Sequence, residues 1–186
     1  MLFRSNIEKK KLLPFILTFA IILADQITKF LVEFYIPLDY ANGRLGIGPA
    51  FLGDFLRIIR VYNTGVAFSL GDSWPLAVRR LSFGLVPLVV MVLVVVVYFR
   101  NKDFSMLQRW AICGILGGGF GNLIDRFFRA RGVVDFIDVK FYGLFGMERW
   151  PTFNVADSAV VVCGILLVVS FLIQIAKESS QSKRTK

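Results

Sequence analysis

The chain has 186 residues, 56% of them hydrophobic, and its mean hydropathy of +0.66 lies outside the range of ordinary soluble domains. Its formal charge is +9, but the basic residues are dispersed along the chain instead of forming one face, which argues against nucleic-acid binding. Histidine is absent, which excludes His-based triads, Cys-His dyads and His-containing zinc sites, so any hydrolytic chemistry would rest on carboxylates. We expect neither a metal ion nor another cofactor. Cys113 and Cys163 each lie within an apolar segment and are expected to be buried packing residues.

Four apolar segments approach or exceed the roughly 20 residues that a helix needs to cross about 30 Å of hydrocarbon. In chain order they cover, approximately, residues 12–34, 74–99, 106–128 and 153–176. We therefore predict one integral membrane domain over residues 1–186, an all-α protein built as a bundle of four transmembrane helices. Small residues in the third segment, from Gly114 to Gly121, predict a seam where neighbouring helices pack closely.

Basic side chains concentrate in short polar segments beside the spans, at residues 4–11, 100–102 and 177–186. By the positive-inside rule these segments, and with them both termini, are cytoplasmic. The longer loops, about 35–73 and 129–152, then face outward. The first of them is rich in Gly and Pro and becomes strand-like at Phe55–Tyr62, which predicts a small extracytoplasmic β-sheet between the first and second helices.

Ionisable and amide side chains interrupt these apolar segments. Two lie late in the first segment, three late in the third and two at the start of the fourth: Asp25, Lys29, Asn122, Asp125, Arg126, Asn154 and Asp157. Because successive spans cross in opposite directions, all of these positions lie toward the same face of the membrane. A charged side chain at a helix centre costs roughly 2.5–3.5 kcal/mol on insertion scales, so such groups indicate function. The sequence thus predicts a polar site at one edge of the bilayer.

Three acids compete for a catalytic role at this site. The spacing Asn-x-x-Asp ends at Asp125 and again at Asp157, and it places an amide and an acid on one helix face. Asp125 directly precedes Arg126, which predicts an ion pair and a role in holding structure or substrate. Asp135 and Asp157 have apolar sequence neighbours, so burial would favour the protonated form of at least one. If the two share a proton, one carboxylate can activate water while the other polarises a scissile carbonyl, as in aspartyl peptidases.

Purely structural roles remain open for each polar residue. Asp157 could cap the N-terminus of the fourth helix, and Asp135 could be a surface acid of the outer loop. The acid and the lysine of the first segment are spaced i, i+4, which favours a simple ion pair. Asn63 could form an Asx-turn or offer its amide to an extended substrate backbone. We expect Asp138 to be a solvated loop acid.

Five ordered motifs, extending from the first span to the last, resemble those of lipoprotein signal peptidase, also called signal peptidase II. The motifs are Asp25-Gln26-Ile27-Thr28-Lys29, Asn63-Thr64-Gly65-Val66-Ala67-Phe68, Gly121-Asn122-Leu123-Ile124-Asp125-Arg126, Val133-Val134-Asp135-Phe136-Ile137-Asp138 and Phe153-Asn154-Val155-Ala156-Asp157-Ser158. The resemblance implies a bacterial inner-membrane aspartyl endopeptidase that removes the signal peptide of a prolipoprotein, cutting just before a diacylglyceryl-modified cysteine. The segment Lys140–Thr152 departs from the family pattern by being a few residues longer.

The same resemblance assigns roles to individual residues. It implies that the catalytic pair is Asp135 and Asp157. Residues implied to line the substrate site are Asn63, Asn122, Asp125, Arg126 and Asn154, and residues implied to support it are Asp25, Lys29 and Gly65. The implied partners are a diacylglyceryl-modified prolipoprotein and membrane lipid, and we expect a monomer with its active site near the outer face.

The main alternative is a small proton-coupled transporter, because buried acids also build proton relays. Such a protein would distribute polar residues through the depth of the membrane. Here they gather at one edge, and the second span is nearly without polar atoms. A purely structural membrane subunit would leave the cost of burying several acids uncompensated.

Overall fold

The structure is a computed structural model that describes residues 11–38, 46–64, 75, 78 and 81–184. Its elements, in chain order, are α2 (Phe15–Tyr35), β1 (Gly46–Phe51), β2 (Leu56–Asn63), η2 (Leu81–Leu85), α4 (Val86–Arg100), α5 (Met106–Phe128), β3 (Val133–Val139), η3 (Leu144–Gly146) and α6 (Val155–Arg184). The fold is mostly helical, with one small sheet, as the sequence predicted.

Three helical segments within the described residues are long and apolar enough to cross a membrane: Phe15–Tyr35, Leu81–Arg100 and Val155–Gln181. The third expected span is helical over the predicted residues, as α5, but it carries the charged side chains Arg109, Asp125 and Arg126. α5 packs against α2, α4 and α6, and its charged groups are held by the protein. α6 extends past the expected end near residue 176 to Arg184.

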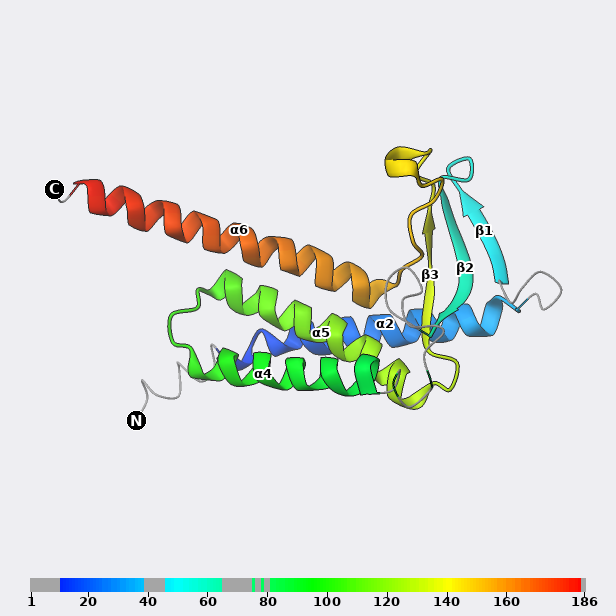
Figure 1. Cartoon of the computed structure of the whole chain (residues 1–186), viewed down its shortest axis with the longest axis horizontal. Coiled ribbons are helices and arrows are strands. Elements are labelled where there is room, and N and C mark those ends of the chain that lie inside the picture. Colours follow the sequence, from blue (N-terminus) through cyan, green and yellow to red (C-terminus); the bar gives the residue numbers. More distant parts are fainter. Residues whose placement is uncertain (1–10, 39–45, 65–74, 76–77, 79–80, 185–186) are drawn as a thin grey trace.

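The helices run side by side, and the sheet lies at one end of them (Figure 1). The start of α2, the turn between α4 and α5 and the end of α6 all lie at the opposite end. The strands run across the helix direction, so the sheet extends sideways beyond the helices. This arrangement brings the end of α2, the end of α5 and the start of α6 together beside the sheet.

The sheet is antiparallel, with the strand order β1-β2-β3. Strands in the first loop were predicted, but β3 was missed because it comes from the segment between α5 and α6. Its first four residues, starting at Val133, are all buried, so it lacks the alternation of a half-exposed strand. The register pairs Val61 with Asp135 and Asn63 with Val133, which brings the end of β2 beside the buried acid of β3.

Glycines of α5 form the predicted packing seam. A Cβ atom on Gly118 would lie 2.3 Å from the carbonyl oxygen of Ala156 in α6, and one on Gly117 would lie 3.0 Å from a side-chain atom of Ile21 in α2. The missing side chains therefore allow α5 to lie close to both neighbours. Cys113 and Cys163 are buried free thiols, as predicted.

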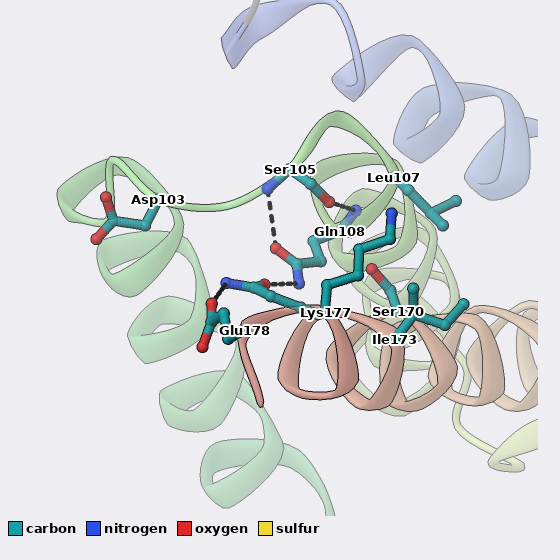
Figure 2. A pocket seen from close by; sticks show the side chains of 9 residues that line it. Asp103, Ser105, Leu107, Gln108, Ser170, Ile173, Lys177 and Glu178 are labelled. Carbon is teal, nitrogen blue, oxygen red and sulfur yellow. Dashed lines mark hydrogen bonds between the residues drawn. The ribbon is translucent and has the colours of Figure 1, made fainter. Parts of the chain in front are cut away.

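A second polar cluster lies at the far end of the helices, beside a cleft of about 440 Å³ between the start of α5 and the end of α6 (Figure 2). Ser105 and Gln108 form a capping box at the start of α5. Gln108 then donates to Gln174 at 3.0 Å, and Gln174 donates to Glu178 at 3.0 Å. This chain of hydrogen bonds satisfies the buried amide of Gln108 and ties the two helix ends together.

Candidate active site

Asp157 lies in the first turn of α6, where it forms a reciprocal pair of hydrogen bonds with Asn154. The backbone N–H of Asp157 donates to Asn154 Oδ1 at 2.9 Å, and the backbone N–H of Asn154 donates to Asp157 Oδ2 at 3.1 Å. This is the capping-box arrangement, so Asn154 is the N-cap residue and Asp157 is the third residue of the helix. The other oxygen of Asp157, Oδ1, accepts a hydrogen bond of 2.7 Å from Asn122 Nδ2.

Asp135 lies on β3 and is only 3% exposed. Its two oxygens accept hydrogen bonds from two amides, at 2.7 Å from Asn154 Nδ2 and at 3.0 Å from Asn63 Nδ2. Burial, together with the negative charge of Asp157, raises the pKa of Asp135 to about 7. Asp135 is therefore an interior group, and the surface-acid alternative is wrong.

Two asparagine side chains, Asn154 and Asn122, connect the two acids to each other, and a third holds Asp135. Asn154 is fully buried and donates to both Asp135 Oδ1 and Asn122 Oδ1, at 2.7 and 3.1 Å. Asn122 in turn donates to Asp157. Asn63 ends β2 and holds Asp135 from the sheet side. The acids of β3 and α6 thus share one buried amide network, although they are far apart in the sequence.

A fully buried ion cluster lies behind this network. Lys29 Nζ is 2.8 Å from Asp25 Oδ2 and 2.6 Å from Asp125 Oδ2, and all three side chains have no exposed area. The ammonium group also donates to Asn122 Oδ1 at 2.9 Å. The predicted ion pair between Asp25 and Lys29 is present, and the second acid extends it.

Asp25 also contacts the helix that carries Asp157. Its Oδ1 accepts a hydrogen bond of 2.9 Å from the backbone N–H of Ala156 in the first turn of α6. Such N–H groups have no partner within the helix, and a carboxylate there is favoured by the helix dipole. The ion cluster therefore fixes the start of α6 as well as Asn122.

Asp125 has other ion-pair partners than its predicted partner, the neighbouring Arg126. Asp125 pairs with Lys29 and, at 2.8 Å from its Oδ1, with Arg129 Nε. Arg126 instead lies with its guanidinium carbon 5.7 Å from the centre of the Phe83 ring. Its positive charge is within electrostatic reach of Asp135 and Asp157 and also of Asp125.

The sequence reasoning missed two residues of this region. Gln26 donates hydrogen bonds to Asp25 and Asp125, at 3.2 and 3.1 Å. Arg129 joins Asp125 to Glu33 of α2. The spacing i, i+4 between Asp125 and Arg129 was a signal that could have identified this pair. Gly65 lies outside the described residues.

Asp138 is not the solvated loop acid that we expected. It is 2% exposed and lies between two guanidinium groups, with Arg57 Nη2 at 2.7 Å and Arg149 Nε at 2.7 Å. Arg57 is its register partner on β2, and Arg149 reaches it from the segment after β3. Asp138 thus connects the sheet to the segment that follows it.

A family model described as signal peptidase (SPase) II matches residues 17–173 of the chain. A lipoprotein signal peptidase of Treponema pallidum is 49% identical over 177 residues, which cover 95% of this chain and 92% of that protein. A second lipoprotein signal peptidase, from Treponema denticola, is 48% identical over 93% of this chain and 96% of its own length. A solved structure titled "Bacterial membrane enzyme structure by the in meso method at 2.3 A resolution" has a TM-score of 0.71 at 24% identity, covering 88% of this chain and 90% of that one, which shows a shared fold.

Proposed function

The chain belongs to the signal peptidase II family, and on that premise we propose that it is an aspartic endopeptidase that cleaves diacylglyceryl-modified prolipoproteins immediately before the lipidated cysteine. The observation that carries the proposal is the joining of Asp135 and Asp157 through Asn154 in a buried amide network. Aspartic peptidases use two carboxylates in one low-dielectric site as their catalytic groups.

The surroundings of the two acids suit different protonation states. Asp157 lies at the start of a helix and accepts hydrogen bonds from Asn122 and from the backbone of Asn154, all of which favour its ionised form. Asp135, with its pKa raised to about 7, is the acid that holds a proton near neutral pH. We assign Asp157 as the base and Asp135 as the acid.

In this mechanism Asp157 takes a proton from a water molecule as the water oxygen attacks the scissile carbonyl carbon. Asp135 gives its proton to the carbonyl oxygen, which leaves a neutral tetrahedral diol. The C–N bond then breaks as the proton held by Asp157 passes to the leaving nitrogen and a diol proton returns to Asp135. Both acids end in their starting states.

The other site residues have positioning and binding roles in this proposal. Asn122 and Asn154 hold the carboxylates, while Lys29, Asp25 and Asp125 hold Asn122 and the start of α6. The remaining residues, Asn63 and Arg126, lie beside the acids and would line the substrate site, and Gly65 would support that site.

We further propose that α5 is a fourth membrane-spanning helix, in a single domain over residues 1–186 of a monomeric protein of the bacterial inner membrane. Its buried charges suit a helix surrounded by α2, α4 and α6. The basic flanks at residues 100–102 and 177–186 favour cytoplasmic termini, and we propose on this ground that the sheet and the acids lie toward the outer face. A substrate could then enter sideways from the lipid.

The transporter alternative has less support. The acids lie at the sheet end of the helices, and the other polar cluster lies at the far end. Between them, residues 111–120 of α5 contribute no carboxylate and no basic side chain. A continuous proton path would need such groups along the whole depth of the membrane.

The proposal is tested with the purified chain in lipid nanodiscs and a precursor presented with and without its diacylglyceryl group. We expect cleavage of the lipidated precursor alone, and mass spectrometry should find the modified cysteine at the new N-terminus. Failure to cleave the lipidated precursor, or cleavage at another bond, would contradict the proposed substrate.

A further inference from the structure

The segment after β3 turns back on itself and exposes a cluster of apolar side chains. The backbones of Lys140 and Arg149 form an antiparallel β-bridge. Between these two residues, Phe141 N donates to Glu148 O at 2.8 Å and Gly143 N donates to Met147 O at 3.0 Å. At the end of this hairpin, Tyr142, Leu144 and Phe145 are 66%, 55% and 81% exposed. We call these three residues the aromatic tip.

The composition of the turn that carries the aromatic tip is unusual for a turn that faces water. Residues 141–147 read Phe-Tyr-Gly-Leu-Phe-Gly-Met and contain no charged side chain, and the Tyr142 hydroxyl is their one polar side-chain group. Turns in water usually carry Asn, Asp, Ser or Pro beside glycine. A cluster of large apolar side chains at a protruding point marks an interaction site.

The backbone of the tip is held in a conformation that bulky residues avoid. Tyr142 and Phe145 have φ angles of 52° and 54°, in the left-handed region. Non-glycine residues in that region cost of order 1–3 kcal/mol each and persist where the surroundings fix them, often at functional points. Here the strained backbone carries two largely exposed aromatic rings. The Phe145 ring lies 6.3 Å from the Phe141 ring, and Lys140 Nζ lies 5.5 Å from the centre of the Tyr142 ring.

A rigid base supports the hairpin. Arg149 Nε donates to buried Asp138 at 2.7 Å, and Arg149 Nη1 lies 3.3 Å from Asp54 in the turn between β1 and β2. The rings of Phe141 and Trp150 pack with their centres 5.0 Å apart. The tip is therefore fixed relative to the sheet rather than free to fold back over it.

The position of the hairpin relative to the helices indicates which part of a membrane it would contact. Figure 1 shows the hairpin beyond the end of β3, to the side of the helices and at about the level of the first turns of α6. Its neighbour, the β1–β2 turn, exposes Leu52 by 80%. At the same end of the helices, Phe34, Tyr35 and Phe128 are also largely exposed. If these helices cross a bilayer, the hairpin lies at the depth of the interfacial region of that bilayer.

We propose that the aromatic tip inserts into the interfacial region of the lipid leaflet on the sheet side of the membrane. Aromatic side chains are enriched at that depth because an apolar ring and a polar atom are both accommodated there. The tip would act as a second anchor that fixes the outward end of the sheet against the bilayer. This inference depends on the helices crossing a bilayer but not on the proposed catalytic residues.

The experiment places a fluorescent reporter at the tip. Trp74, Trp110 and Trp150 are replaced by Phe, and Phe145→Trp or Tyr142→Trp is introduced as the single tryptophan, with Lys102→Trp at the far end of the helices as the control. Each chain is reconstituted in nanodiscs, and its emission is measured with lipids brominated near the headgroup and with iodide in the buffer. The unbrominated disc gives the reference intensity.

We expect the reporter at the tip to lose about half of its emission in brominated lipid and little with iodide, since interfacial apolar groups lie roughly 5–10 Å into the headgroup and acyl boundary. Iodide should quench the Lys102→Trp control more strongly than it quenches the tip. Iodide quenching of both tip positions to the level of the control would place the tip in water and overturn the proposal. Protection from both quenchers would also overturn it, because it would indicate a protein contact such as a second copy of the chain.

Discussion

Asn154 Nδ2 donates a hydrogen bond of 2.7 Å to Asp135 Oδ1. The same side chain accepts the backbone N–H of Asp157 at 2.9 Å, so one amide touches both the acid of β3 and the residue that carries the acid of α6. Moving this amide would move both carboxylates relative to each other. Asn154 therefore fixes the position of Asp135 on the sheet relative to Asp157 on the helix.

Substitution of Asn154 should separate helix capping from the positioning of the acids. Asn154→Ala removes both roles, whereas Asn154→Ser keeps an N-cap oxygen, so the alanine variant should lose about 1 kcal/mol more of the free energy of unfolding than the serine variant. Both variants lose the donor to Asp135, so kcat should fall by about 100-fold in each. Denaturant unfolding and initial cleavage rates measure the two effects, and full activity in the serine variant would contradict the positioning role.

The stability of the protein should depend on pH through Asp135. Its pKa is raised to about 7 in the folded protein by burial and by the charge of Asp157, and its ordinary value in an unfolded chain is about 3.9. Between these values the folded state binds more protons, so the stability that this group contributes is fully present below about pH 4 and is lost as the pH rises through about 7. Unfolding free energies at about pH 5 and about pH 8 should differ less in Asp135→Asn than in the wild type. An unchanged difference in the variant would show that Asp135 does not titrate in this range.

The buried ion cluster should be sensitive to loss of its cation. Lys29→Met leaves Asp25 and Asp125 buried next to each other without their shared ammonium group, which should cost about 3–5 kcal/mol of stability. Lys140→Met is the matched control, because Lys140 is 29% exposed and lies 3.9 Å from Asp54, a pair that contributes about 0–1 kcal/mol. Chemical unfolding in detergent compares the variants, and equal losses would show that burial does not strengthen the cluster.

The glycine seam should transmit packing changes to Asp157. In Gly118→Ala the new Cβ would lie 2.3 Å from the carbonyl oxygen of Ala156, so the first turn of α6 must shift. Overpacking of this kind costs about 1–3 kcal/mol, and kcat should fall with the displacement of the acid. Gly164→Ala, with nothing within 4 Å of its Cβ, should leave both quantities close to those of the wild type. Similar activity in the two variants would contradict this coupling.

Several features of the site could be predicted from sequence because they depend on local helix geometry. The Asn-x-x-Asp spacing correctly placed Asn122 with Asp125 and Asn154 with Asp157 on polar faces at one end of the helices. The apolar neighbours of Asp135 correctly indicated its burial. These inferences need only the helical repeat and the composition around a residue.

The errors arose where long-range packing decides the partners. Asp125 was expected to pair with Arg126 because they are adjacent, but residues at i and i+1 do not face each other on a helix. Its partner Lys29 lies on another helix, nearly a hundred positions away in sequence. Asp138 was misjudged for a similar reason, since its burial depends on Arg149 returning from a hairpin that sequence patterns did not reveal.

The central claim is that Asp135 and Asp157 together cleave the substrate. Its most direct measurement is turnover of a diacylglyceryl-modified precursor by the full chain carrying Asp135→Asn or Asp157→Asn, with circular dichroism to verify that the helices remain folded. We predict that each variant keeps its helical spectrum and loses all detectable cleavage, because an amide can neither accept nor release the shared proton. Cleavage at a rate close to that of the wild type in either folded variant would contradict the mechanism.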